Sequence, residues 1–356
     1  PIYFSFNQTN SPQNKMMKTM ILATLAASAC ALNVHDRGYY EAKFVNWLST
    51  HKMATPTGEK FVTMLQNFAN NDDIIETHNA KKLSYSLGHN QFSHMTFEEF
   101  RDYVRLGLDR PASTTKAAFV HSAPKDMTAV PASIDWTTLG AVTPVKDQGQ
   151  CGSCWSFSST GAMEGAYFNK HGSLESMSEQ NFVDCDSLRN GGRDHGCNGG
   201  LMDNAFSWAN KNGGLCSEGD YPYTSGTTKT EGTCSDSACK NSAFAPSSFT
   251  DVSANSDDAM MSALAQQTVA IAIQADDVSF QLYSSGVYTA DCGTNLDHGV
   301  LAVGYGSLDG TDYYKVKNSW GDSWGLDGYI LFGRGSSYNN GAGQCGMLSE
   351  PSYPNF

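Results

Sequence analysis

The stretch Gln148–Ser158, which reads QGQCGSCWSFS, decides how the rest of the chain is interpreted. It holds two closely spaced cysteines, Cys151 and Cys154, and apolar residues at helical spacing follow the second one. Ser153 is a suitable N-cap, so the pattern predicts a helix that begins at Cys154. A thiol at a helix start lies at the positive end of the helix dipole, which lowers its pKa and favours the nucleophilic thiolate. The stretch therefore predicts a reactive cysteine.

Charge divides the chain into two parts. Residues 131–356 hold 10 Lys and Arg against 25 Asp and Glu, whereas residues 1–130 hold 13 against 11. Because the C-terminal part is so acidic, we expect no nucleic-acid partner. The difference in sign suggests two pieces that attract each other, one of which is removable.

The first 31 residues predict a leader. Residues 17–31 combine a lysine, a short apolar run and a small-residue cleavage signal, as a secretory signal peptide does. The polar residues 1–16 lack an initiator Met at their start, and we interpret them as untranslated sequence. No apolar run is long enough to span a membrane, so we expect a soluble product of the secretory pathway after signal removal. Its destination would be a lysosome- or vacuole-like acidic compartment or the extracellular space.

Residues 38–106 show apolar stripes at helical spacing and predict helices, with a capping-box signal at Thr96–Glu99. Asn90–Phe92 is expected to be a short extended piece between them. Taken alone, this segment predicts a small helical bundle without chemistry. Residues 107–130 are rich in Ala, Ser, Thr and Pro, which is typical of an exposed linker open to proteolysis.

The remainder, residues 131–356, has helices first and strands later. Helices are predicted at 154–170 and 200–211, and runs rich in Val, Ile and Tyr predict strands at 268–275, 298–305, 313–317 and 329–332. This order favours an α+β fold, with two lobes and a cleft between them.

The cysteine count also points to a reactive thiol. The chain has ten cysteines, of which Cys30 lies in the predicted signal peptide, and the other nine lie at or beyond Cys151. An odd number in a secreted protein implies one free thiol or an intermolecular bond. A reactive thiol needs a base, and residues 131–356 offer His171, His195 and His298. On general grounds a histidine that opens a strand, as His298 does, is more often structural.

Four motifs together resemble those of the papain and cathepsin L family of cysteine proteases: QGQCGSCWSFS at 148–158, GCNGG at 196–200, DHGVLAVGYG at 297–306 and KNSWG at 317–321. Residues 38–106 resemble the family's inhibitory propeptide more weakly, with departures at Lys60, Met64 and His94. The resemblance implies a papain-like two-lobed fold behind a helical prodomain. It also implies a monomeric endopeptidase made as a zymogen, which acts on proteins and peptides, is inhibited by its own propeptide and needs no metal or cofactor.

The resemblance assigns catalytic roles by position. Cys154 matches the nucleophile, and His298 matches the base that pairs with it. Asn318 matches the residue that orients the imidazole, and Trp320 matches the ring that shields this contact from water. Gln148 matches the side-chain donor of the oxyanion hole, and the backbone N–H of Cys154 would be the second donor.

The resemblance also assigns substrate-binding residues. Gly199 and Gly200 match the backbone edge along which an extended peptide lies. The second substrate pocket would have Met202, Ala272 and Gly299 in its walls and Glu350 on its floor. Small apolar walls favour Leu, Phe or Val, and an ionised Glu350 would also accept Arg. Equally, a surface glutamate usually turns to solvent.

Four disulfides complete these expectations. The resemblance implies the bonds Cys151–Cys197, Cys185–Cys234 and Cys292–Cys345. Cys216 and Cys239 remain, and we predict that they form a fourth bond.

Three other classes of protein share some of these sequence features. The pair Cys151 and Cys154 also resembles a thioredoxin-like redox motif, although no βαβ pattern precedes it. A catalytically silent binding protein on the same fold would usually lack the nucleophile, which is present here. A structural zinc site has no second Cys/His pair to complete four ligands.

Overall fold

The computed structural model describes residues 33–106 and 115–356, so the predicted signal peptide and the first part of the linker lie outside the described residues. The chain forms two compact units, which end and begin at Ile74 and Ile75 and are described separately. None of the described helices is both long and apolar enough to cross a membrane.

Two helices lie in the described part of the first unit. They are α2 (Arg37–Thr50) and the first part of α3 (Glu59–Asn79). Phe44 is fully buried and lies within 5.6 Å, centroid to centroid, of the rings of Trp47 and Phe68. An ion pair of 2.5 Å between Lys43 Nζ and Asp72 Oδ1 also joins the two helices. The apolar stripes therefore form a helix pair, as the periodicity predicts.

The second unit contains the remaining elements. Its helices are α4 (Phe97–Val104), α5 (Cys154–His171), α6 (Glu179–Cys185), α7 (Met202–Asn212), α8 (Ser225–Thr228), α9 (Asp257–Leu264) and α10 (Val278–Gln281). Its strands are β1 (Tyr85–Leu87), β2 (Phe119–His121), β3 (Ile134–Asp135), β4 (Ser248–Val252), β5 (Val269–Ile273), β6 (Tyr283–Tyr288), β7 (His298–Leu308), β8 (Thr311–Lys317), β9 (Tyr329–Gly333) and β10 (Ser352–Asn355).

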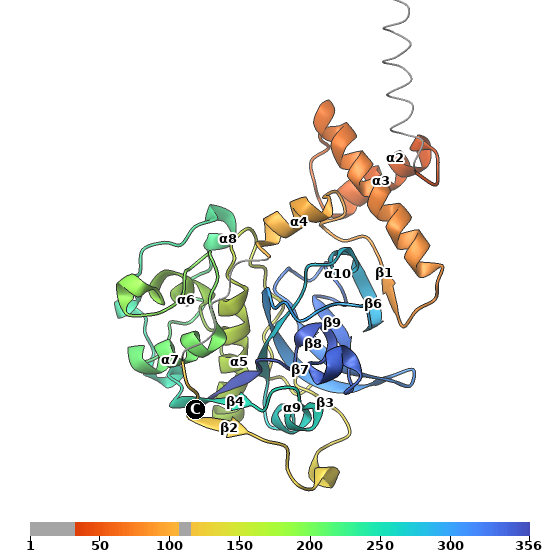
Figure 1. The fold of residues 1–356 in the computed structure, drawn as a ribbon. Coiled ribbons are helices and arrows are strands. Elements are labelled where there is room, and N and C mark those ends of the chain that lie inside the picture. The colour runs from red at the N-terminus through yellow and green to blue at the C-terminus, as the bar shows by residue number, and fades with distance from the viewer. Residues whose placement is uncertain (1–32, 107–114) are drawn as a thin grey trace, which may run out of the picture. The chain divides into compact units, whose positions relative to one another are not determined.

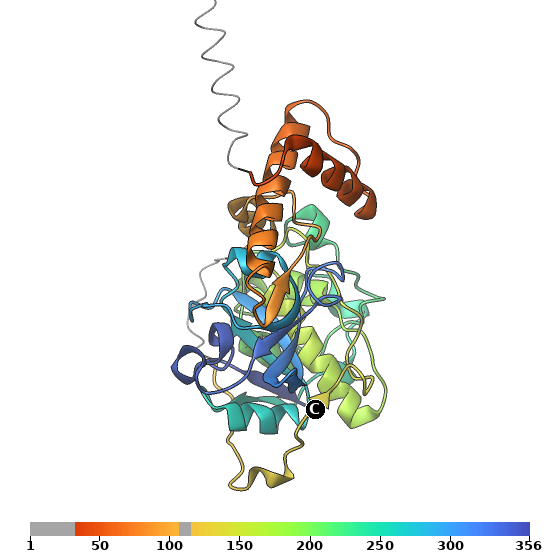
Figure 2. The same ribbon diagram turned by 90° about the vertical axis from the view of Figure 1, so that its right-hand side faces the viewer.

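These elements form two lobes with separate cores. The strands follow the order β1-β6-β9-β8-β7-β5-β10-β4-β2, with β3 paired to β7. Helices α5, α6 and α7 lie together beside the sheet (Figures 1 and 2). One apolar core lies among these helices and the near side of β5 and β7, and the other lies among the strands, α9 and α10. The α+β, two-lobed prediction is confirmed.

Helix α5 packs directly on β5 and β7 because two of its residues are glycines. A Cβ at Gly161 would lie 2.7 Å from Leu301 Cδ2, and one at Gly165 would lie 2.2 Å from Thr268 Oγ1. This close approach brings the first residue of α5, Cys154, next to the first residues of β7.

The short extended piece lies earlier than predicted. Strand β1 is formed by Tyr85–Leu87, whereas Gln91 and Phe92 lie in a turn. Asn90 explains the difference, because its Oδ1 accepts the Phe92 N–H and its Nδ2 donates to the Gln281 carbonyl at 2.7 Å. This turn-forming use of Asn competes with an extended backbone.

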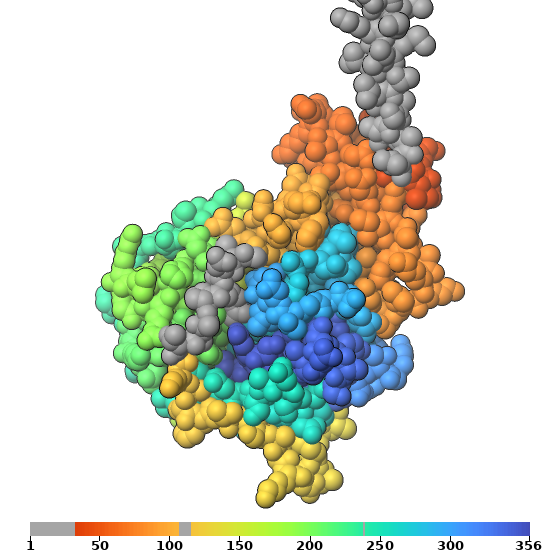
Figure 3. Space-filling view, in the orientation of Figure 1, coloured from red at the N-terminus to blue at the C-terminus, as the bar shows by residue number. Residues whose placement is uncertain are grey.

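The described part of the linker lies on the edge of the sheet. Strand β2 pairs with β4 in parallel, and Phe119 and Val120 are mostly exposed. In the space-filling view, this yellow segment and the turn after it stand out beside α9 (Figure 3). The linker role of residues 107–130 stays a prediction.

Candidate active site

Cys154 is the first residue of α5, as the motif predicts, and it is in none of the four disulfides. Ser153 occupies the N-cap position, but its side chain makes no capping hydrogen bond. Instead, its Oγ lies 2.7 Å from the hydroxyl of Tyr223. The thiol receives a hydrogen bond from the Gly299 N–H, with 3.3 Å between N and Sγ.

The histidine that the motif selects lies in this site. His298 is fully buried at the start of β7, and its Nε2 lies 2.8 Å from Asn318 Oδ1. The Trp320 ring stacks on the imidazole with 4.7 Å between centroids. Trp320 is 1% exposed and covers one face of the imidazole.

The other two candidate histidines lie elsewhere. His171 ends α5 and stacks on Tyr167, and His195 lines a cavity with Arg189 and Glu231.

Gln148 is fully buried beside the start of α5. Its Nε2 donates to the carbonyls of Cys151, at 3.1 Å, and Val104, at 3.2 Å. Its Oε1 accepts from the hydroxyl of Ser319, which fixes the orientation of the amide. The Val104 carbonyl oxygen is thus already bound to the Gln148 amide.

That carbonyl belongs to the last residue of α4, and further contacts hold the segment in place. The Arg105 guanidinium donates to Asn198 Oδ1 at 2.9 Å, and Gln91 Nε2 donates to the Trp320 carbonyl. Arg105 also lines a cavity of only about 10 Å³ together with Cys154 and both predicted edge glycines. Little space therefore remains for a substrate beside Cys154.

The predicted edge and pocket walls come together near Cys154. Gly199 has a φ of +99°, which favours glycine, and a Cβ at Gly200 would lie 2.5 Å from the Trp155 ring. Ala272 pairs with Gly299 across β5 and β7, and a Cβ at Gly299 would lie 3.3 Å from Met202 Sδ.

Glu350 lies in a larger cavity, of about 410 Å³, which Met202 also lines. Asp203, Asp251 and Val120 contribute to the same wall. The structure thus brings Met202 between the small cavity at Cys154 and the larger one at Glu350.

Four disulfides are present: Cys151–Cys197, Cys185–Cys234, Cys216–Cys239 and Cys292–Cys345. The first joins the loop before α5 to the loop that carries the edge glycines. Cys151 is therefore unavailable for a redox pair with Cys154. Cys185, Cys234 and the Asp236 carboxylate lie close together, but the first two sulfurs are bonded to each other, which does not suit a zinc site.

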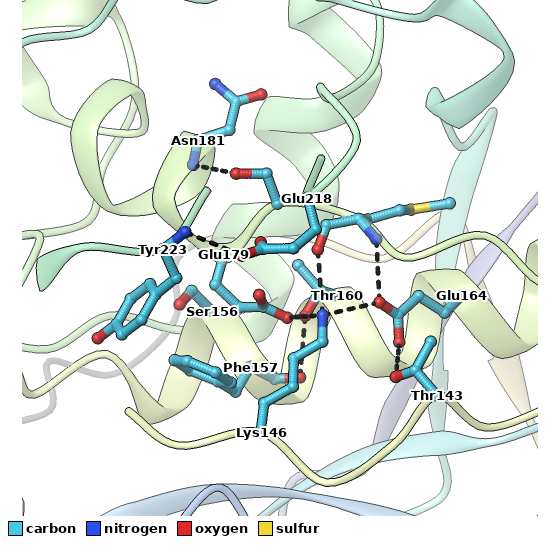
Figure 4. A network of polar contacts seen from close by, with 12 residues as sticks. Thr143, Lys146, Ser156, Phe157, Thr160, Glu164, Glu179, Asn181, Glu218 and Tyr223 are labelled. Carbon is cyan, nitrogen blue, oxygen red and sulfur yellow. Dashed lines mark hydrogen bonds and ion pairs between the residues drawn. The ribbon is translucent and has the colours of Figure 1, made fainter. Parts of the chain in front are cut away.

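A charged cluster of Lys146, Glu164 and Glu179 lies along one side of α5 (Figure 4). The Lys146 ammonium is 3.1 Å from Glu164 Oε1 and 2.7 Å from Glu179 Oε1. Burial lowers the pKa of Lys146, but the two carboxylates outweigh this effect and raise it above its usual range. Thr143 and Thr160 donate to the same carboxylates. The cluster ties α5 to α6 and to the strand-like segment before Gln148.

Lys317, the last residue of β8, is connected to this cluster through Thr143. It directly precedes Asn318, and its ammonium donates to the carbonyl and hydroxyl of Thr143. Burial lowers the pKa of Lys317 to about 8. Sequence analysis missed the whole network, because charged residues usually lie at the surface and no motif marks them.

Comparison with known proteins agrees with this geometry. Residues 130–355 match the papain family cysteine proteases, and residues 44–100 match the cathepsin propeptide inhibitor domain. The senescence-specific cysteine protease SAG39 of Oryza sativa subsp. japonica is 39% identical over 346 residues, which cover 95% of this chain and 99% of that protein. Cysteine protease XCP2 of Arabidopsis thaliana is 42% identical over 312 residues, 87% of this chain and 85% of that protein.

A solved structure of a recombinant stem bromelain precursor aligns with a TM-score of 0.79 and 36% identity, covering 89% of this chain and 99% of that one. The thiol at a helix start, the ordered imidazole and the two matched domains lead to one conclusion. The chain belongs to the papain family of cysteine proteases and carries the family's propeptide inhibitor domain, so it is a protease zymogen.

Proposed function

We propose that Cys154 and His298 are the catalytic pair of this protease. The observation that carries the proposal is the position of the imidazole, whose Nε2 bonds to Asn318 while the Cys154 thiol bonds to the Gly299 N–H beside it. An imidazole held in this way has one nitrogen to take the thiol proton, which yields a thiolate–imidazolium pair.

The reaction then follows from these groups. The Cys154 thiolate adds to the scissile carbonyl carbon, and the new oxyanion accepts hydrogen bonds from Gln148 Nε2 and the Cys154 N–H. The C–N bond breaks as His298 gives its proton to the departing amine, which leaves a thioester. His298 next takes a proton from water, the hydroxide oxygen adds to the thioester carbon, and the C–S bond breaks to release the acid.

The zymogen is proposed to be inactive because its propeptide occupies the hydrogen-bonding groups that a substrate would need. Gln148 Nε2 donates to the Val104 carbonyl instead of an oxyanion. We assign residues 38–106 to the inhibitory propeptide, 107–130 to the activation linker and 131–356 to the peptidase domain. The signal peptide would direct the chain into the secretory pathway. Processing in acid, in a vacuole-like compartment or outside the cell, would then yield a monomeric enzyme.

Active-site labelling tests the catalytic assignment. The chain from residue 32 onward is acidified, and cleavage of a fluorogenic peptide is followed before and after treatment with a thiol-reactive peptide inhibitor. We expect activity only after acidification, with one label per chain at Cys154. The Cys154→Ala variant should show neither label nor activity, and activity that survives in it would overturn the assignment.

Substrate choice in the second pocket is proposed to depend on Glu350. Its carboxylate lines the cavity that continues from Met202, so it can pair with an Arg side chain, while the apolar walls accept Phe. Glu350→Ala should reduce kcat/KM for a peptide with Arg in the second position at least tenfold more than for the matched Phe peptide. An equal effect on both peptides would show that Glu350 faces solvent.

A further inference from the structure

Two buried aspartates, Asp186 and Asp194, hold the loop that precedes the predicted substrate edge. Both side chains are at most 2% exposed. Asp194 Oδ1 accepts hydrogen bonds from the Leu201 N–H and from Asn204 Nδ2, each at 3.0 Å. Leu201 directly follows the glycine edge, so Asp194 fixes the end of that edge.

Packing adds to these hydrogen bonds. A Cβ at Gly200 would lie 2.8 Å from Asp194 Cγ and 2.5 Å from the Trp155 ring. The Gly200 backbone is therefore clamped between the ring that follows Cys154 and the Asp194 carboxyl group. A movement of Asp194 would move the edge relative to the thiol.

The two carboxyl groups are close enough for each to shift the pKa of the other. Asp186 Oδ1 accepts the Arg193 N–H at 3.1 Å, so one oxygen of each group has a donor from an amide. The other oxygen of each, Oδ2, is buried and has no other partner among the described residues. A single proton held between these two oxygens would satisfy both, because two carboxylate oxygens cannot hydrogen-bond to each other without one.

The surroundings favour retention of this proton. Burial raises the pKa of Asp186 to about 6, and burial together with the neighbouring Asp186 charge raises the pKa of Asp194 well above its usual range. Neutral groups face the pair from α5 and α7, namely Trp155 and Asn204. The Arg193 guanidinium turns to the hydroxyl of Thr115.

Charged side chains also line the cavity beside Asp194: Asp184, Arg189, His195 and Glu231. These carry both signs and stand across an open cavity of about 420 Å³, so solvent screens them from the pair.

We propose that Asp186 and Asp194 are positioning residues, whose shared proton keeps the Gly199–Gly200 edge in its substrate-binding geometry. The proposal rests on the proposed role of that edge. Because the pair keeps its proton below its raised pKa, the edge is ordered in acid and loosens as the pH rises through that raised pKa. Substrate binding then weakens with pH, while the catalytic pair keeps its own geometry.

Steady-state kinetics of the acid-processed enzyme test this coupling. Between pH 5 and pH 8 we expect KM for a peptide amide to rise several-fold and kcat to change much less. Asp194→Asn preserves the contacts, because the amide still accepts from Leu201 and donates to Asp186 without a proton that can leave. Its KM should stay at the acid value over the whole range. Asp194→Ala loses these hydrogen bonds and should raise KM at every pH.

The matched control is Asp258→Asn, which makes the same change at an exposed position of α9 and should leave the pH profile of KM as it was. A pH dependence of KM in Asp194→Asn equal to that of the unchanged enzyme would overturn the proposal.

Hydrogen exchange separates this failure from a failure of the proposed edge. With Cys154 blocked by iodoacetamide, amide protection factors in residues 196–201 should fall above pH 6 in the unchanged enzyme and remain constant in Asp194→Asn. Protection factors that do not change with pH in either the unchanged enzyme or Asp194→Asn would overturn the proposal of a shared proton. Protection that responds while KM does not would keep the pair but remove the Gly199–Gly200 edge from substrate binding.

Discussion

Two sets of acidic residues are buried in the second unit, and they are neutralised in different ways. In the charged cluster, the Lys146 ammonium lies between Glu164 and Glu179. In the acid pair, Asp186 and Asp194 have amide donors and each other. A buried cation keeps its charge over the whole physiological range, whereas a shared proton leaves as the pH rises. The comparison predicts that the first group depends on its lysine and the second depends on pH.

Removal of the cation should have the largest effect. Lys146→Met leaves two buried carboxylates without compensation, and we expect the free energy of unfolding to fall by about 3 kcal/mol. This is the lower end for a buried pair, because the lysine side chain keeps 21% of its surface exposed. Urea unfolding of the full chain in a Cys154→Ala background, which prevents autolysis, gives the value.

The matched control for this change is Lys315→Met. Lys315 also forms an ion pair of 2.8 Å, but its partner Asp135 is a third exposed, so less than about 1 kcal/mol should be lost. Equal losses in the two variants would show that burial of the cluster contributes nothing.

The acid pair should give the next largest effect, with the opposite sign. From about pH 4 upward the unfolded chain releases aspartate protons while the folded pair keeps its own, so the unchanged chain should lose stability, by at most about 1.4 kcal/mol per pH unit, until the pH passes the raised pKa of the pair. Asp194→Asn cannot lose this proton, so at pH 8 it should be about 2 kcal/mol more stable than the unchanged chain. At pH 4.5 the two should be nearly equal. Urea unfolding at both pH values measures the difference, and a pH-independent gain would instead indicate better packing.

The sequence predicted the part of the site that motifs mark. Cys154, His298 and Asn318 lie in three short motifs, and the helix at 154 and the strand at 298 follow from ordinary periodicity. The lobes and the helical prodomain also follow, because long periodic segments survive tertiary packing.

Buried charge was beyond sequence reasoning for a physical reason. Lys146 and Asp194 have the composition of surface residues, and only the packing of α5 against distant segments removes them from water. The same holds for the contact between Gln148 and the Val104 carbonyl, which joins positions 44 residues apart. The turn at Asn90 could not be predicted for the same reason, because it depends on a hydrogen-bond acceptor at the distant Gln281.

The smallest expected effect is at Glu218, beside the charged cluster, where both a nearby lysine and protonation affect the charge of a carboxyl group. Glu218 accepts the Tyr223 N–H at 2.9 Å, and burial followed by the charge of Glu179 raises the pKa of Glu218 to about 7. Its protonated form is thus favoured in the folded chain, and stability is lost as the pH rises through 7. Lys146 opposes this shift and limits the loss.

Glu218→Gln should therefore leave stability unchanged at pH 5 and raise it by about 1 kcal/mol at pH 8.5, because the amide keeps the Tyr223 contact without a charge. Urea unfolding at the two pH values is the measurement. In Lys146→Met the same substitution should stabilise the chain more at pH 8.5, because Glu218 then faces Glu179 without the nearby cation. A gain that is the same with and without Lys146 would mean that the lysine does not reach Glu218, and the charged cluster would then end at Glu179.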